Sequence, residues 1–105
     1  MQQAERSLTI LLATAPDRPG FRHAVNLAGA ALRRGVRVYL YCLDDAVTGV
    51  RDERLQALHA RGLRLYACAY AAQRRHQPRG DEATYAGLAA LGELIERTDR
   101  FVSFA

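Results

Sequence analysis

The sequence predicts an α/β fold, a three-layer α/β/α sandwich around a mostly parallel sheet of four to five strands, flavodoxin/Rossmann-like. Short apolar runs alternate with segments whose apolar residues recur at helical spacing. Half of the residues are hydrophobic and a quarter are charged, as in ordinary globular domains. The length of 105 residues fits a single domain over residues 1–105, in which residues 1–6 are expected to be a flexible N-terminus.

The first half of the chain is predicted to contain two strands and two helices. Residues 7–14 form a nearly continuous apolar run, which is typical of a strand buried on both faces. After a Pro/Gly loop, an apolar stripe at helical spacing runs to Gly35, which can adopt the left-handed conformation that ends helices. Residues 36–42 are rich in β-branched and aromatic side chains and predict a second strand, followed by an acidic loop over 43–49. A second helix is expected over about residues 52–61.

A short internal repeat indicates where the third strand begins. The sequence GVRVY at residues 35–39 recurs as GLRLY at residues 62–66, and each copy joins a helix-ending glycine to a strand. We therefore predict a third strand over residues 63–67. Residues 69–75 are mostly good helix formers, so Cys68 is expected at the N-terminus of a helix.

The last part of the chain is predicted to be a loop, a helix and a strand. Residues 76–80 form the loop, and Asp81 is expected to cap the last helix. The apolar stripe of that helix would consist of Tyr85, Leu88, Leu91 and Ile95. Residues 100–104 make the final strand.

The charge of the chain does not predict a nucleic-acid partner. All 15 basic residues are arginine, which excludes chemistry that needs a lysine amine, and the net charge is +4. The arginines are scattered among acids, and the pairs 33–34 and 74–75 fall at expected helix ends, where they complement the helix dipole. No nucleic-acid-binding module accompanies them. No apolar run approaches a membrane span and the N-terminus has no apolar signal core, so we expect a cytoplasmic protein without a membrane partner.

The two cysteines, Cys42 and Cys68, are the main candidates for chemistry. Both are expected to be free thiols at the carboxyl-terminal edge of the sheet, where catalytic groups gather in parallel α/β folds. A helix N-terminus at Cys68 would favour the thiolate, which is the nucleophilic form. The alternative interpretation is that either cysteine is only a small buried side chain. For Cys42 the packing interpretation is preferred, and a relay thiol that serves Cys68 is the alternative.

The other polar candidates are weaker. His76 and Arg75, close in sequence to Cys68, are expected as auxiliary groups that could add positive charge near a thiolate. Their structural alternatives are a solvated loop residue and a helix cap. His23 and His59 are expected at the surface, and no pair of histidines has the spacing of a metal site.

The stretch GLRLYACAYAAQRR at residues 62–75 resembles the signature of the DsrE/DsrF-like (TusD-like) sulfur-carrier family. In that family a strand ends in a cysteine, here Cys68, and a small-residue helix that closes in basic residues follows. The resemblance extends over nearly the whole chain, to residues 28–35, 44–47, 84–88 and 99–102.

The resemblance implies a sulfurtransferase-like carrier that accepts and passes on sulfane sulfur as a persulfide on Cys68, in sulfur oxidation or in a tRNA-thiolation relay. It implies no metal or organic cofactor. Its partners would be donor and acceptor thiol or persulfide proteins, and its assembly a homo-oligomer (trimer or hexamer) or a hetero-oligomer with related subunits. Apolar side chains outside the expected core, namely Tyr70, Phe101 and Phe104, would then be covered by a neighbouring subunit.

The chain departs from the family pattern at two positions. His76 stands where the family often has glycine after the basic pair, and Ala46 stands where it tends to have glycine after the second strand. Some family subunits lack the cysteine and serve only as scaffold. Two alternatives therefore stay open: a catalytically silent oligomeric scaffold in which Cys68 only packs, and a small-ligand-binding α/β module that uses the loop 16–20. That loop lacks the GxGxxG arrangement of dinucleotide sites.

Overall fold

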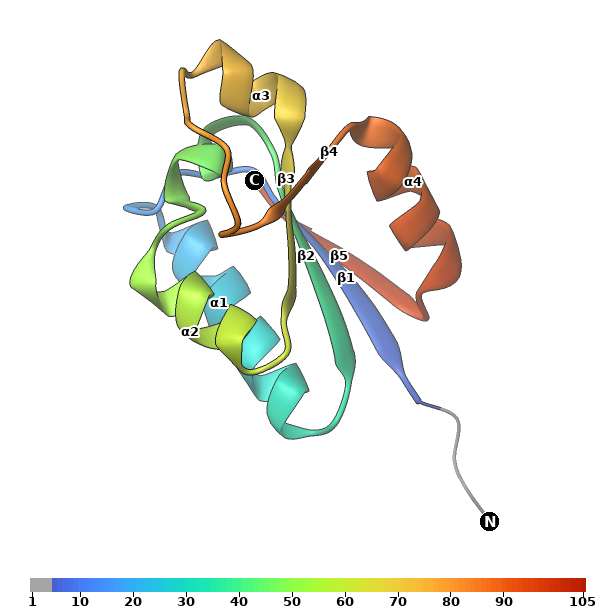
Figure 1. Cartoon of the computed structure of the whole chain (residues 1–105). Coiled ribbons are helices and arrows are strands. Elements are labelled where there is room, and N and C mark those ends of the chain that lie inside the picture. The colour runs from blue at the N-terminus through green and yellow to red at the C-terminus, as the bar shows by residue number, and fades with distance from the viewer. Residues whose placement is uncertain (1–4) are drawn as a thin grey trace.

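The computed structural model describes residues 5–105, which form one five-stranded sheet with the order β4-β3-β2-β1-β5 (Figure 1). Every neighbouring pair of strands is parallel. The strands are β1 (Ser7–Leu12), β2 (Arg37–Cys42), β3 (Arg64–Cys68), β4 (Thr84–Ala86) and β5 (Arg100–Phe104). The helices are α1 (Pro19–Arg33), α2 (Glu53–Ala60), α3 (Ala69–Arg74) and α4 (Leu88–Arg97), with a 3₁₀ helix η1 (Asp44–Gly49) after β2. Within the described part of the chain, no helix has the length and hydrophobicity needed to cross a membrane.

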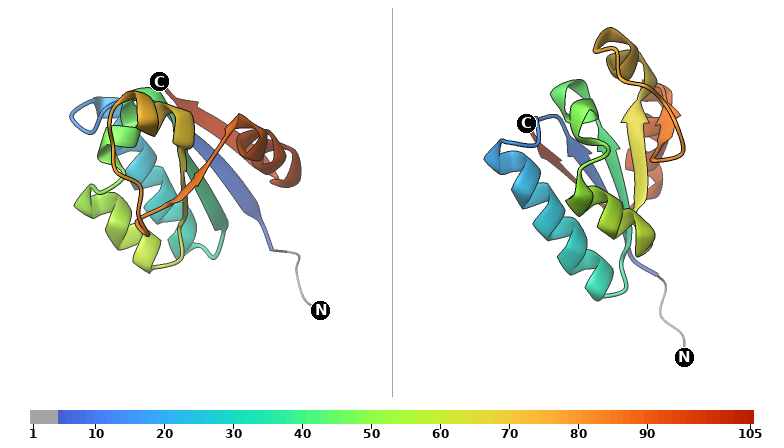
Figure 2. Two further views of the ribbon diagram at one scale, coloured as in Figure 1. Left: turned by 45° about the horizontal axis from the view of Figure 1, so that its top comes forward. Right: turned by 60° about the vertical axis from the view of Figure 1, so that its left-hand side comes forward.

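The helices lie on both faces of the sheet (Figures 1 and 2). Helices α1 and α2 cover one face, α4 alone covers the other, and α3 lies beyond the carboxyl end of β3. We call the two faces the α1/α2 face and the α4 face. The predicted three-layer α/β fold is therefore confirmed.

The main core lies between the sheet and α1 and α2. Thr9 identifies the opposite, α4 face, because its hydroxyl lies 3.3 Å from the Leu94 carbonyl of α4. Side chains alternate along a strand, so the neighbours of Thr9 and their partners on adjacent strands point toward α1 and α2. The fully or almost fully buried residues on that side include Ile10, Leu12, Val38, Leu40, Leu65, Phe21, Ala24 and Leu55.

Three helices end in the same backbone motif. The residue after each helix cap adopts a left-handed conformation: Gly35 (φ 80°) after α1, Gly62 (φ 113°) after α2 and His76 (φ 54°) after α3. In each case the N–H of that residue donates to the carbonyl three positions earlier, and the next N–H donates to the carbonyl five positions before it. This is the Schellman arrangement, which satisfies carbonyls at the helix end. The two predicted glycine joints are confirmed, and α3 uses the same joint with a histidine.

The predicted helix cap at Asp81 is wrong. Asp81 lies in a turn, and residues 84–86 form β4, which pairs in parallel with residues 66–68 of β3. Helix α4 begins only at Leu88. The segment is a strand because its backbone groups find partners on the exposed edge of β3, and this tertiary pairing overrides the local apolar spacing.

The apolar stripe predicted for the last helix is also partly wrong. Tyr85 lies in β4 rather than in the helix, and Leu88 and Ile95 are exposed. Leu91 and Leu94 are the side chains of α4 that are buried against the sheet. Leu91 and Leu94 are three residues apart and lie on one face of the helix, which is the face that packs on the sheet.

The flexible N-terminus expected over residues 1–6 falls mainly on residues 1–4, which lie outside the described part of the chain. Glu5 forms an ion pair with Arg37 at 2.6 Å. The carbonyl of Arg6 accepts a hydrogen bond from the Arg37 N–H at 2.9 Å. These two residues therefore continue along β2.

Candidate functional site

Strand β3 ends at Cys68, which is also the N-cap of α3. Its backbone is extended (φ −68°, ψ 117°), and its Sγ accepts a hydrogen bond from the Ala71 N–H at 3.4 Å. The first N–H groups of a helix have no partner within the helix. The sulfur takes the place that a serine or aspartate oxygen commonly fills at this position. The predicted location of Cys68 at a helix N-terminus is confirmed.

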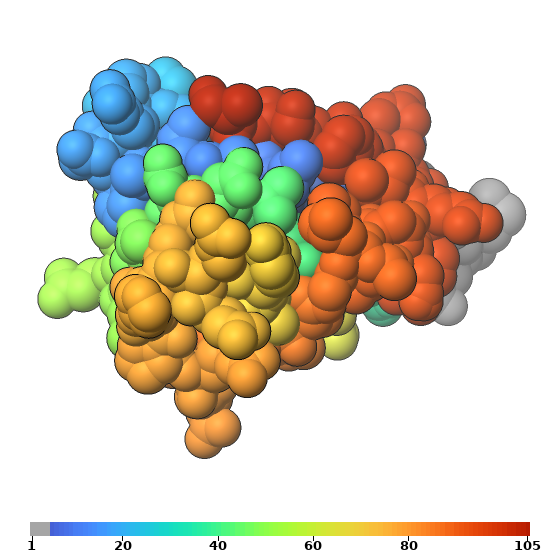
Figure 3. Space-filling model, turned by 90° about the horizontal axis from the view of Figure 1, so that it is seen from above, coloured from blue at the N-terminus to red at the C-terminus, as the bar shows by residue number. Residues whose placement is uncertain are grey.

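Cys68 lines an open pocket of about 630 Å³ at the carboxyl end of the sheet. Figure 3 views the molecule from this end, with α3 in gold and the start of α4 in orange. The pocket is lined by Leu43, Asp44, Cys68, Tyr70, Ala71, Arg74, Arg75, Gly87 and Leu88. Only 3% of Cys68 is exposed, so a partner must enter the pocket to reach its sulfur.

Two arginines from the end of α3 line this pocket, and they are held differently. Arg75 donates to the Asp45 carboxylate of η1, with both nitrogen–oxygen distances 3.1 Å. Arg74 donates to the Tyr70 hydroxyl at 3.3 Å, and its guanidinium lies 5.9 Å from the centroid of that ring. Among residues 5–105, Arg74 has no carboxylate within ion-pair distance. Its charge therefore remains available to an anion in the pocket.

His76 is exposed and does not line the pocket. It occupies the left-handed position that ends α3, with a φ of 54°. Its place in the fold is therefore that of the glycine that the family often has there, and the backbone turn is kept. The structure thus brings Arg75 to the pocket, whereas His76 lies outside the pocket lining, after the end of α3.

Cys42 lies near Cys68 along the sheet but faces the other way. It pairs in register with Ala67, the residue before Cys68. Because side chains alternate along a strand, Cys42 points to the α1/α2 face and Cys68 to the α4 face. Cys42 has no exposed surface, and burial raises the pKa of its thiol to about 12. This geometry favours the packing interpretation of Cys42 over a relay role.

Tyr41 is a residue of this site that the sequence pattern did not single out. It lies on β2, has no exposed surface, and its hydroxyl donates to the Ala86 carbonyl of β4 at 2.9 Å. Burial raises the pKa of its phenol, and the neighbouring Cys68 raises it further through its charge and as a hydrogen-bonding group. One signal was available: a tyrosine within a strand predicted to be buried needs a partner for its hydroxyl.

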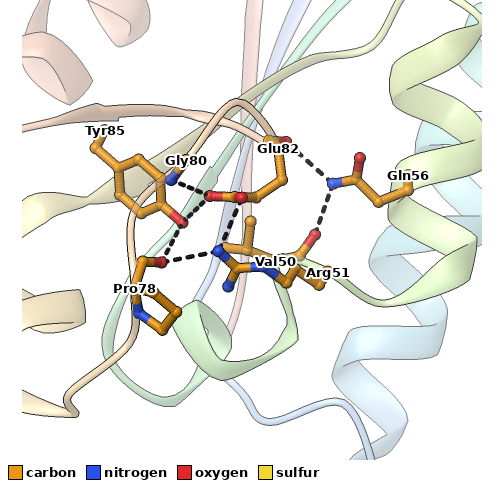
Figure 4. Close-up of polar contacts among 7 residues, drawn as sticks. All are labelled: Val50, Arg51, Gln56, Pro78, Gly80, Glu82 and Tyr85. Atoms are coloured by element: carbon orange, nitrogen blue, oxygen red, sulfur yellow. Dashed lines mark hydrogen bonds and ion pairs between the residues drawn. The ribbon is translucent and has the colours of Figure 1, made fainter.

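A polar network holds the loop between α3 and β4 (Figure 4). The Glu82 carboxylate accepts hydrogen bonds from the Gly80 N–H at 2.8 Å, from the Tyr85 hydroxyl at 2.6 Å and from Arg51 at 2.8 Å. Arg51 also donates to the Pro78 carbonyl at 2.9 Å. This network fixes the path of the loop that leads to β4 and to the pocket wall at the start of α4.

Comparisons with known proteins agree with this architecture. The family model described as the DsrE/DsrF-like family matches residues 6–104. Among solved structures, the crystal structure of the ychN protein from E. coli matches with a TM-score of 0.81 and 20% sequence identity, covering 94% of this chain and 99% of that chain. At this identity the structural likeness supports the fold alone. A comparison with curated protein sequences gave no match.

Proposed function

Because the chain belongs to the DsrE/DsrF-like family, we propose that it is a sulfur carrier that accepts and passes on sulfane sulfur as a persulfide on Cys68. Members of this family generally act in sulfur-relay complexes, and membership supports a sulfur-relay-related role. The observation that carries the finer proposal is the setting of Cys68: a thiol at the N-cap of α3, in an open pocket that Arg74 also lines. The cytoplasm, where thiols stay reduced, is the compartment that we propose.

The proposed reaction has two thiol exchange steps. The Cys68 thiolate attacks the terminal sulfur of a donor persulfide, R–S–SH, and a new S–S bond forms between them. The S–S bond of the donor breaks, and its electron pair stays on the inner sulfur, which leaves as a thiolate. Cys68 is oxidised to a persulfide while the donor is reduced to a thiol, so the step needs no outside oxidant. An acceptor thiolate then attacks the terminal sulfur on Cys68 in the same way and regenerates the Cys68 thiolate.

The pocket supplies what this exchange requires. The Cys68 sulfur accepts a hydrogen bond from the Ala71 N–H, and Arg74 brings a positive charge to the same pocket. The pocket is open, which gives a donor or acceptor sulfur a way in to Cys68. Thiol exchange depends on thiolate character and access, and neither step needs a metal or an organic cofactor.

The proposal is tested by mass spectrometry of protein treated with a polysulfide donor. We expect the Cys68 peptide to gain the mass of one sulfur atom, and the Cys42 peptide to stay unmodified while the protein is folded. Cys68→Ser should take up no sulfur, and Cys42→Ala should be loaded like wild type. A folded wild-type protein whose Cys68 stays unmodified, with a donor that does load a small thiol, would show that the carrier role is wrong.

Assembly with other subunits, which the carrier and scaffold alternatives share, is supported by one observation, the exposure of large apolar side chains. Tyr70 is 65% exposed, Leu88 59% and Phe101 43%. We propose that such side chains contact other subunits, in a homo-oligomer (trimer or hexamer) or in a hetero-oligomer with related chains. If the chain were only a scaffold, Cys68→Ser would leave both assembly and sulfur transfer by the complex unchanged. If it is a carrier, assembly would be kept and transfer lost.

A further inference from the structure

We propose that Tyr41 is a positioning residue for Cys68: its hydroxyl donates a hydrogen bond to the Cys68 sulfur when that sulfur is anionic, and to the Ala86 carbonyl when it is a neutral thiol. The inference rests on the proposed function, because it names a residue that holds the reactive sulfur in place.

The register of the sheet brings Tyr41 to Cys68. Tyr41 on β2 pairs with Tyr66 on β3, two residues before Cys68, and Cys68 pairs with Ala86 on β4. The Tyr41 hydroxyl lies 2.9 Å from the Ala86 carbonyl, two strands away. To span that distance, the ring must cross β3 on the α4 face, which is also the face of the Cys68 side chain. The hydroxyl therefore lies on the face of the sheet that carries the Cys68 side chain, and it bonds to the residue that pairs with Cys68.

The hydroxyl is a donor that keeps its proton. Tyr41 has no exposed surface, so water does not compete for its hydroxyl. Burial raises the pKa of the phenol, and the neighbouring Cys68 raises it further. A neutral phenol has one proton to donate and can also accept. While Cys68 is a neutral thiol, the phenol donates its proton to the Ala86 carbonyl, as the structure shows.

Ionisation of Cys68 changes which acceptor is preferred. Hydrogen bonds to a charged acceptor are roughly twice as strong as those between neutral groups. A rotation of the O–H bond is therefore favourable once the sulfur carries a negative charge. The sulfur already accepts from the Ala71 N–H, so the Tyr41 hydroxyl would be its second donor. Donors from α3 (the Ala71 N–H) and from β2 (the Tyr41 hydroxyl) would then orient the sulfur as well as stabilise its charge.

Other titratable groups also surround Cys68. They are Asp44 and Asp45 of η1 and Tyr70, Arg74 and Arg75 of α3, whereas Ala86, Gly87 and Leu88 on the β4–α4 side do not titrate. In general, carboxylates and guanidinium groups are charged and phenols are neutral between about pH 6 and about pH 8.5. A change in the pH profile of Cys68 within this range, on removal of the Tyr41 hydroxyl alone, therefore reports on that hydroxyl.

The test compares Tyr41→Phe with Tyr39→Phe, a control on the same strand and the same face. The rate of alkylation of the Cys68 peptide is followed by mass spectrometry as a function of pH. We expect the midpoint of the Tyr41→Phe profile to lie about one pH unit above that of wild type, with about tenfold slower alkylation below the midpoint. Tyr39→Phe should match wild type. Equal midpoints for Tyr41→Phe and wild type would overturn the proposal.

A second variant covers the case in which Tyr41→Phe does not fold. Incorporation of 3-fluorotyrosine at position 41 alone makes the phenol a stronger donor and keeps the ring. The midpoint should then fall below that of wild type, and an unchanged midpoint counts against the proposal. Sulfur loading of the wild type separates the two hypotheses. If loading fails but the midpoints shift, the carrier role is wrong and the pairing stands. If loading succeeds without a shift, only the role of Tyr41 is wrong.

Discussion

His76 has a left-handed backbone, with a φ of 54°, which an L side chain adopts at a cost of about 1 kcal/mol. In sequence it is a histidine close to Cys68, and an imidazole can add positive charge near a thiolate. In the structure it ends α3 with the same hydrogen bonds that Gly35 and Gly62 make after α1 and α2. The backbone conformation therefore accounts for this position without a catalytic role.

We predict that His76→Gly raises the free energy of unfolding by about 0.5 to about 1 kcal/mol, because glycine adopts this conformation without strain. The rate of Cys68 alkylation should not change. Urea unfolding and the alkylation assay measure the two effects. Gly62→Ala is the matched control, because no atom lies within 4 Å of a Cβ added at position 62. The free energy of unfolding of this variant should fall by about 1 kcal/mol from backbone strain alone. Slower alkylation in His76→Gly would instead assign His76 a role at the site.

At the scale of elements, β4 and the loop before it lead to Gly87 and Leu88, which line the Cys68 pocket. The strand has three residues, and the preceding loop is held by the Glu82 carboxylate. Burial of Glu82 opposes its charged form, but hydrogen bonds from Tyr85 and the Gly80 N–H outweigh it, and the pKa of Glu82 lies below its ordinary value. The pKa of Glu82 is lower in the folded state than in the unfolded chain, where it is about 4.3. Ionised Glu82 therefore stabilises the fold at pH values above about 4.3.

This stabilisation should be complete at neutral pH and should be lost as the pH falls below about 4, through the folded pKa of Glu82. We predict that Glu82→Gln lowers the free energy of unfolding by about 1 to about 2 kcal/mol at neutral pH and that the difference from wild type shrinks toward about pH 3. Denaturant titrations at both pH values measure this. Glu93→Gln, at an exposed position on α4, should behave like wild type. A constant difference across this range would contradict the assigned role of the carboxylate.

Most elements could be predicted because each has a local signal of its own. The glycines at 35 and 62 mark helix ends, and the apolar run that leads to Cys68 marks a strand end at the carboxyl edge of the sheet. Strand β4 could not be predicted, because three residues become a strand only by pairing with β3. The position of the Tyr41 hydroxyl could not be predicted for the same reason, because its hydrogen-bond acceptor, Ala86, belongs to β4. Cys68 could thus be located from the sequence, and its second donor could not.

At the scale of the whole molecule, the two faces of the sheet are covered unequally. Two helices cover one face and a single helix of ten residues covers the other. Phe101 on the edge strand β5 is 43% exposed, and Ile95 on α4 is 38% exposed. Large apolar side chains exposed at a sheet edge favour contact with another subunit.

We predict that Phe101→Asp reduces the mass of the assembly measured by sedimentation, because a carboxylate cannot be buried at an apolar contact without a large desolvation cost. Asn26→Asp, at an exposed position on α1, adds the same charge and should leave the mass unchanged. A wild-type protein that sediments as a monomer at working concentrations, or a Phe101→Asp variant of unchanged mass, would contradict this prediction.

The place of β1 inside the sheet, between β2 and the edge strand β5, has a consequence for how the chain is made. Strand β1 (Ser7–Leu12) pairs on one side with β5, with Leu8 opposite Arg100. During synthesis that side of β1 has no partner until the last strand has emerged, so the sheet is completed late and folding is slowed by a contact distant in sequence. A nascent chain that stops before β5 leaves one edge of the apolar strand β1 unpaired. That edge can pair with other nascent chains on the same messenger RNA and so start aggregation.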